Sequence, residues 1–264
     1  MDSPTLLPRL TIITVCLNAG KTLLRTLNSI ASQTYPNIEV ILCDGGSIDD
    51  SEGIFKQWLE VSESKLARIH WVRQQSVGMY AAMNEAALQA SGEVITFLHA
   101  NDAFDHAQVC EIAMLGLKAN SDIHAFYGDI KVLSEHWWKR RFISARWWRP
   151  WMLSWGFMSP QPGFFVKSMT FRTVGPFIET MRIGADFEWM CRFYHVCGFS
   201  AQWLMNIQVN MLSGGVSMRG KESRKIITKE IAQALRSHGY KVSMLKLWVR
   251  LPLKGYGILR AIWR

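Results

Sequence analysis

Four short runs of apolar residues divide the first hundred positions of the chain. Each is rich in β-branched or aromatic residues and ends at a polar or glycine-rich segment, which is typical of a buried strand. The runs are Leu10–Leu17, Ile38–Cys43, Ile69–Val72 and Val94–Leu98. Helical patterns lie between them, as in Leu23, Leu27 and Ile30 after the first run. This alternation predicts β-α-β units and an α/β fold with a mostly parallel sheet.

The second half of the chain has a less regular pattern. It predicts strands over 125–132 and 163–166, and helices over 186–196 and 223–238. The last helix has apolar residues on one side, and Gly239 fits its C-terminal end. We therefore expect one domain over residues 1–217 and a helical, basic, amphipathic appendage over residues 218–264.

The composition agrees with a folded protein. Hydrophobic residues make up 49% of the 264 positions and charged residues 19%, which excludes a disordered chain. The five cysteines form no C-x-x-C pair and no zinc-ligand spacing, so we expect free thiols in a reducing compartment. The start resembles no secretory signal, and no apolar stretch reaches the roughly 18 residues of a spanning helix. We expect a cytoplasmic protein that is peripheral on the inner face of the cell membrane.

The positive charge is concentrated at the C-terminal end. The net charge is +9, yet residues 215–264 contain twelve Lys or Arg and two Glu, a balance of +10, which leaves −1 for residues 1–214. Nucleic acid is therefore not an expected partner, since the main domain carries no basic excess. In the tail, Lys246, Arg250 and Lys254 recur every four residues among apolar ones. This favours a helix lying on an anionic membrane surface, with docking on the domain as the alternative.

Polar residues follow three of the predicted strands. Asn18, Asp44 and Asn101-Asp102 stand at the carboxyl ends, where open α/β sheets bind ligands. The chain has neither G-x-G-x-x-G after the first strand nor G-x-x-x-x-G-K-[ST], which argues against nicotinamide and P-loop enzymes. In Asp44-Gly45-Gly46-Ser47, a carboxylate could accept a hydrogen bond from a base or ribose, while the glycines let the backbone approach a ligand. A tight turn with a capping residue is the alternative.

Five segments resemble, in the right order, a family 2 glycosyltransferase of the GT-A nucleotide-sugar type. They are TIITVCLNAGKTLLRTLNSIASQTYPNIEVILCDGGSIDDS, VGMYAAMNEAALQASGEVITFLHANDAF, QPGFFVKSMTFRTVGPF, IGADFEWMCRF and LSGGVS. The resemblance covers about residues 10–217 and is closest to bacterial transferases that build exopolysaccharide, capsule or O-antigen. It implies a Rossmann-like GT-A fold and an enzyme that moves a sugar from a nucleotide-diphosphate donor to an acceptor hydroxyl.

The resemblance also implies which residues bind the donor. Those residues are Thr14, Asn18, Asp44, Gly46, Asp49, Gly78, Tyr80, Asn84 and Asp102. Asp44 matches the acid that hydrogen-bonds the base. The chain departs from the family pattern at Ala81, where the family has Asp, and at Ser76, where an acid commonly precedes the glycine.

Two further carboxylates carry the chemistry that the resemblance implies. His99-Ala100-Asn101-Asp102 stands where the family shows Asn-x-Asp-Asp, so Asp102 would bind Mg²⁺ or Mn²⁺ against the diphosphate. Asn101 replaces the first acid of that motif. Asp186 aligns with the general base that takes the acceptor's proton in an inverting transfer, and a helix N-cap is compatible with that role. Glu188 is two residues further on and would point away.

The expected function is therefore an inverting glycosyltransferase of surface polysaccharide biosynthesis. Its partners would be a nucleotide-sugar donor, a glycan or polyprenyl-linked acceptor and an anionic membrane surface. Asn101 and Ala81 keep open an alternative, a non-catalytic relative that binds nucleotide-sugar or glycan as an assembly partner. The Trp- and Arg-rich stretch 137–155 suits a membrane interface, sugar stacking or a surface loop over a Trp-rich core.

Overall fold

One sheet forms the centre of the structure, a computed structural model that describes residues 7–62, 66–134, 140–213 and 220–248. Among these residues the sheet has the order β3-β2-β1-β4-β8-β6-β9-β5, with β7 paired to β6. The strands are β1 (Leu10–Cys16), β2 (Ile38–Asp44), β3 (Arg68–Arg73), β4 (Val94–Phe97), β5 (Asp102–Phe104), β6 (Ala125–Leu133), β7 (Arg141–Ile143), β8 (Phe165–Lys167) and β9 (Ala201–Leu212). The α-helices are α1 (Leu23–Ala31), α2 (Ser51–Ser62), α3 (Met79–Gln89), α4 (Val109–Ala119), α5 (Ser168–Val174), α6 (Ala185–Cys191) and α7 (Gly220–Ser237).

The amino-terminal half of the sheet is parallel. Strand β1 pairs with β2 and β4, and β2 pairs with β3, all in the parallel sense. Both faces of β1 are covered, because Ile13 and Val15 belong to one core cluster while Leu10 and Ile12 belong to another. The carboxyl ends of β1, β2 and β4 therefore lie along one edge, where the polar residues were expected.

The carboxy-terminal half mixes both senses of pairing. Strand β8 is antiparallel to β4 and β6, whereas β9 is parallel to β6 and antiparallel to β5. The register of β6 against β9 shifts between Tyr127 and Asp129. At Gly128 the backbones approach so closely that an added Cβ would lie 1.8 Å from the carbonyl oxygen of Ile207. A glycine at this position is therefore a condition for pairing the two strands.

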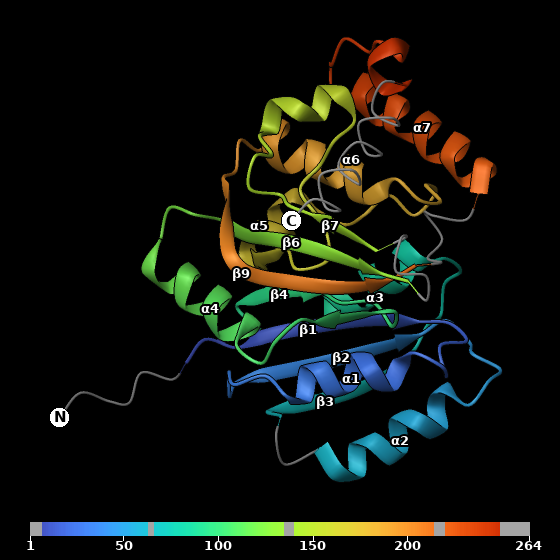
Figure 1. The fold of residues 1–264 in the computed structure, drawn as a ribbon, viewed down its shortest axis with the longest axis vertical. Coiled ribbons are helices and arrows are strands. Elements are labelled where there is room, and N and C mark those ends of the chain that lie inside the picture. The colour runs from blue at the N-terminus through green and yellow to red at the C-terminus, as the bar shows by residue number, and fades with distance from the viewer. Residues whose placement is uncertain (1–6, 63–65, 135–139, 214–219, 249–264) are drawn as a thin grey trace.

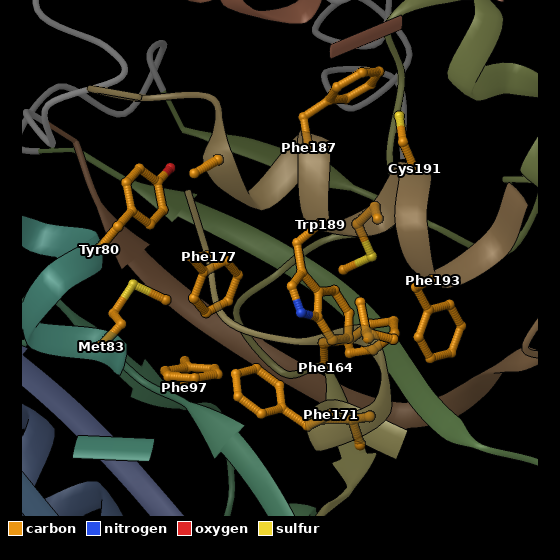
Figure 2. Packing of buried hydrophobic residues seen from close by; sticks show 14 of the residues in the cluster. Tyr80, Met83, Phe97, Phe164, Phe171, Phe177, Phe187, Trp189, Cys191 and Phe193 are labelled. Carbon is orange, nitrogen blue, oxygen red and sulfur yellow. The ribbon is translucent and has the colours of Figure 1, made fainter. Parts of the chain in front are cut away.

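The helix α7 packs on α6, at the end of the molecule opposite α2 (Figure 1). Its residues Ile231, Ala234 and Leu235 are buried in the cluster that contains Trp189 of α6. Figure 2 shows the centre of this cluster, where Phe177 lies between Tyr80 and the Trp189 ring. The appendage predicted from residue 218 onward thus shares its core with the preceding residues, and the boundary at residue 217 stays a prediction.

The α/β prediction is confirmed, and the predicted strands and helices appear with small shifts of their ends. The last part of the predicted helix over 186–196 is a π-helical turn over Arg192–Val196. Helix α4 and strand β9 were not predicted, because neither has a clear apolar period. All five cysteines are free. No helix within the described residues is long and apolar enough to cross a membrane.

The Trp-rich stretch divides between the surface and the core. Trp148 is buried against Tyr127, with ring centroids 5.8 Å apart, whereas Trp147 and Trp151 are exposed. Residues 137–139 of the stretch lie outside the described residues, as do Arg250 and Lys254 of the basic tail. For the described part, the prediction of a loop over a Trp-containing core agrees with Trp148.

Candidate functional site

The loop after β2 folds around the carboxylate of Asp44. The backbone N–H of Ser47 donates to both carboxylate oxygens, at 3.2 and 3.1 Å, and the Ser47 hydroxyl and the Gly46 N–H donate to it as well. Gly46 has a φ of 89°, which is a left-handed conformation that glycine adopts without strain. Asp44 is only 2% exposed. The capping turn considered as an alternative is therefore present, and the carboxylate holds the loop in a fixed shape.

The loops that follow β1 and β2 are joined by reciprocal hydrogen bonds. The Asn18 N–H donates to Ser47 Oγ at 2.8 Å, and the Ile48 N–H donates to Asn18 Oδ1 at 2.9 Å. Asp49 accepts from the Gly20 N–H at 2.9 Å and from Ser51. The hydrogen bond from the Ser51 hydroxyl is the main cause that lowers the pKa of Asp49. These bonds bring Asn18, Asp44 and Asp49 together in one polar double loop, as the sequence predicted.

Thr14 is placed differently from the other predicted donor residues. It lies in β1 with no exposed surface, and its hydroxyl has no hydrogen-bond partner among the described residues. A ligand cannot reach this side chain in the conformation described. The role predicted for Thr14 at the nucleoside pocket stays a prediction without support from its exposure.

Asp102 is a buried carboxyl beside an arginine. It is 2% exposed, and burial raises its pKa to about 7, against the opposing effect of the positive charge of Arg25. The Arg25 guanidinium itself donates to the carbonyl oxygens of Asn101 and Asn210, at 3.2 and 3.3 Å. The charge of Arg25 and the burial of Asp102 both disfavour a cation at this carboxyl.

The part of the chain that the structure describes contains no group of three His, Cys, Asp or Glu side chains that could hold a metal ion. Asn101, which replaces an acid, instead accepts a hydrogen bond from Thr22 through its amide oxygen, at 2.8 Å. A divalent ion usually needs six oxygen ligands, and the protein would supply one buried carboxylate. The residues present do not fit a metal site by themselves, so the prediction of Asp102 as a ligand stays a prediction.

Asp186 lies in the first turn of α6 and is contacted from α3. The Asp186 Oδ1 accepts a hydrogen bond from the Phe187 N–H at 2.7 Å, and the Tyr80 hydroxyl lies 3.4 Å from the same oxygen. The Tyr80 hydroxyl also donates to the carbonyl oxygen of Ile183 at 2.5 Å. Figure 2 shows Tyr80 reaching from α3 toward the beginning of α6. Tyr80 therefore contacts the predicted base and the loop that leads to it.

Asn84, one helical turn after Tyr80, is fully used in bonding the same loop. Its amide nitrogen donates to the carbonyl oxygen of Phe177 and to Glu179, both at 2.9 Å, and its amide oxygen accepts from the Phe177 N–H at 2.9 Å. Asn84 is 7% exposed. In the described conformation it anchors the loop before α6, and its predicted contact with the donor stays a prediction.

Glu230 of α7 holds the end of that loop, a role that the sequence did not suggest. Its carboxylate accepts from three consecutive backbone N–H groups, those of Arg182 at 2.7 Å, Ile183 at 3.0 Å and Gly184 at 2.7 Å. These residues directly precede α6. A lone acid in a basic helix was the only signal in the sequence, and it is too general to indicate this contact.

Glu188 is structural, which agrees with the expectation that it is not the base. It is 2% exposed, and its carboxylate pairs with Arg192 and His238, each at 2.8 Å. The Arg192 guanidinium also donates to the carbonyl oxygens of Val174 and Pro176. Glu188 thus ties α6 to α7 and to the loop that starts at Gly175.

A small cavity connects Asp186 to the fourth strand. Asp186, Gln161 and Phe97 line it together with aromatic residues of the core. Gln161 forms a side-chain hydrogen bond with His99, whose pKa burial lowers to about 4, so the imidazole is neutral at pH 7. The His99 carbonyl accepts from the Asp102 N–H at 2.8 Å. Asp102 and Asp186 are therefore linked through two residues at one edge of the sheet.

A second series of contacts connects Asp186 to Asp44. The Asp44 carbonyl accepts from the Gln74 N–H at 2.9 Å, and Gln74 Nε2 donates to the carbonyl oxygen of Gly78 at 2.7 Å. Gly78, with a φ of 119°, begins the helix that carries Tyr80. The three acids predicted to meet, Asp44, Asp102 and Asp186, thus lie on one connected set of loops.

Comparisons with known proteins agree with this arrangement. The family model described as glycosyl transferase family 2 matches residues 11–187. A glycosyltransferase of PGL/p-HBAD biosynthesis from Mycobacterium bovis is 29% identical over 231 residues, which cover 86% of this chain and 84% of that protein.

Solved structures show the same fold at lower sequence identity. The mannosyltransferase PcManGT from Pyrobaculum calidifontis, in complex with GDP-Man and Mn²⁺, has a TM-score of 0.65 at 19% identity, over 90% of this chain and 66% of that one. S. aureus TarS 1-349 in complex with UDP-GlcNAc has a TM-score of 0.68 at 16% identity, over 88% of this chain and 68% of that one. Both similarities identify the GT-A fold.

Proposed function

Because the chain belongs to glycosyl transferase family 2, we propose that it moves a sugar with inversion from a nucleotide-diphosphate donor to an acceptor hydroxyl. The family assignment favours an enzyme over the binding-only alternative that Asn101 and Ala81 left open. Two proteins of the same fold were solved with nucleotide sugars, which supports a donor of that class. The double loop of Asn18, Asp44 and Asp49 is the proposed contact for the nucleoside.

The position of Asp186 is the observation that carries the proposal. It is half-buried at the start of α6, beside Tyr80 and on the cavity lined by Gln161. In the proposed step the Asp186 carboxylate takes the proton of the acceptor hydroxyl while that oxygen attacks the anomeric carbon. The bond from that carbon to the diphosphate oxygen breaks, and the nucleoside diphosphate leaves with the electron pair. The transition state resembles that of glycoside hydrolysis.

The acceptor and the cellular location are also part of the proposal. The mycobacterial relative is named for glycoconjugate biosynthesis, and α7 is basic and exposed on one side. We propose a lipid-linked or glycan acceptor and action at the cytoplasmic face of a membrane. Asp102 would contact the diphosphate region, with or without a divalent ion, since it is linked through His99 and Gln161 to the cavity of Asp186.

Replacement of Asp186 by Asn tests the proposed base. The amide cannot take a proton, so transfer should fall by about 10² to 10⁴-fold. Stabilisation of the fold by the matching nucleotide sugar, found by a thermal-shift panel, should remain within about twofold of wild type, since mass action reports binding alone. The same assay run with Mn²⁺, Mg²⁺ and EDTA shows whether transfer needs a divalent ion.

Asp122→Asn is the matched control, because it makes the same chemical change at an exposed turn. This variant should transfer sugar at the wild-type rate. Wild-type transfer by Asp186→Asn would remove the proposed base, whereas loss of donor binding as well would assign Asp186 to the donor.

A further inference from the structure

A groove lies between α7 and the short helical segment over residues 244–248, and the proposed transfer reaction does not use it. Its volume is about 450 Å³. The residues that line it are Arg224, Lys225, Thr228, Lys229, Ala232, Arg236, Met244 and Trp248. The lining combines four cations with two large apolar side chains and contains no acid.

The cationic wall and the floor of the groove come from α7. Arg224, Thr228, Ala232 and Arg236 recur every four residues and therefore form one row along the helix. The two middle members are small and buried, Thr228 at 6% and Ala232 at 2% exposure, so the row has a low centre between two cations. The Thr228 hydroxyl donates to the carbonyl oxygen of Arg224 at 2.7 Å, which leaves the guanidinium groups to face a ligand.

The apolar wall comes from the segment after α7. Met244 is 44% exposed and Trp248 is 56% exposed, although both are large hydrophobic side chains. The segment itself is fixed on the protein, because Leu247 is fully buried and Lys246 Nζ lies 5.0 Å from the centre of the Trp155 ring. The two exposed side chains thus form a built surface that the rest of the described chain leaves open.

A ligand of this groove must be anionic at one side and apolar at the other. Four cations beside each other repel one another and favour a phosphate, because arginine and lysine pair with it through charge-assisted hydrogen bonds. A tryptophan and a methionine at a polar boundary favour hydrocarbon chains near headgroups. Nucleic acid would use the cations but would leave Met244 in water.

We propose that this groove binds one anionic membrane lipid, with its phosphate against Arg224, Lys225 and Lys229 and its hydrocarbon chain against Met244 and Trp248. The proposal deepens the membrane location stated above and is independent of the transfer chemistry. Binding would fix α7 on the membrane surface, and a different side of the same helix holds the loop before Asp186 through Glu230.

Vesicle co-sedimentation of the full chain, without donor or acceptor, tests the proposal. Wild-type protein should bind phosphatidylglycerol vesicles at least tenfold more tightly than phosphatidylcholine vesicles. The triple variant Arg224→Gln, Lys225→Gln, Lys229→Gln should lose at least tenfold, since each cation near an anionic surface contributes about 1 kcal/mol, or about fivefold. The double variant Met244→Ser, Trp248→Ser should lose binding that persists at 0.5 M salt.

A control triple, Lys56→Gln, Lys118→Gln, Arg172→Gln, removes the same charge from exposed positions outside the groove. It should bind as wild type, and circular dichroism should show every variant folded. Equal loss in both triples would reduce the effect to net charge and overturn the proposal. Unchanged binding of the groove triple, or tighter binding of single-stranded RNA than of the vesicles, would overturn it too. None of these outcomes affects the test of Asp186, which measures transfer.

Discussion

Glu230 offers the sharpest test of how the fold prepares the proposed base. Its carboxylate is the common acceptor for the N–H groups of residues 182–184, the last residues before α6. Replacement by Gln keeps the shape of the side chain and removes the charge. We expect Glu230→Gln to leave the chain folded but to loosen the loop that places Asp186.

The expected size follows from the three hydrogen bonds. A hydrogen bond to a charged group contributes about 1.5–3 kcal/mol, against about 0.5–1.5 kcal/mol for a neutral pair. The amide oxygen of Gln can accept from two of the three N–H groups, and its NH₂ group faces the third. We therefore expect the loop to lose about 2 kcal/mol of its preference for the described conformation. If transfer requires that conformation, kcat falls by about thirtyfold, because each 1.36 kcal/mol corresponds to a factor of ten.

The assay compares kcat and the KM for donor in four proteins. Glu222→Gln is the matched control, since it changes an exposed glutamate in the first turn of the same helix. Glu230→Asp keeps the charge and should recover part of kcat. The KM for donor should change by less than about threefold, because Glu230 bonds the loop before α6 and not the double loop of Asp44.

Equal kcat values for Glu230→Gln and Glu222→Gln would refute the positioning argument. A lower kcat that Glu230→Asp does not restore, together with an equally lowered free energy of unfolding, would show that Glu230 acts only on global stability. The positioning role predicts instead that kcat falls at temperatures far below the unfolding transition.

Two further predictions concern single sites in the sheet. Burial raises the pKa of Asp102 from 3.8 to about 7, so between about pH 4 and 7 the folded protein keeps a proton that the unfolded chain loses. The free energy of unfolding should therefore fall as the pH rises through this window, by at most about 1.4 kcal/mol per unit, and level off above it; urea denaturation at several pH values should show a flatter dependence for Asp102→Asn. Gly128→Ala should prevent pairing of β6 with β9 and yield insoluble protein, since its Cβ would meet the Ile207 carbonyl. Gly198→Ala, where nothing lies within 4 Å of the added carbon, should remain soluble and lose only about 1 kcal/mol by thermal denaturation.

Local patterns determined the first half of the fold. The strands after residues 9, 37 and 93 could be predicted because a strand buried on both faces must be apolar along its whole length. Their polar ends could be predicted to meet, since parallel strands bring their carboxyl ends to one edge. The resemblance to a family added Asp186, which no local pattern distinguishes from an ordinary helix cap.

Only the tertiary structure decided which of the candidate residues remain accessible and which bind other parts of the chain. Asn84 is taken up by Phe177, and Asp102 lies buried beside Arg25, because packing brings together segments about 75 to 95 positions apart. The groove beside α7 likewise depends on how residues 244–248 return to the helix. Hydrophobic periodicity reports which side of an element is buried, but it carries no information on which element covers it. That choice is made by shape and hydrogen bonding across the whole molecule, and it gave Glu230 its place before Asp186.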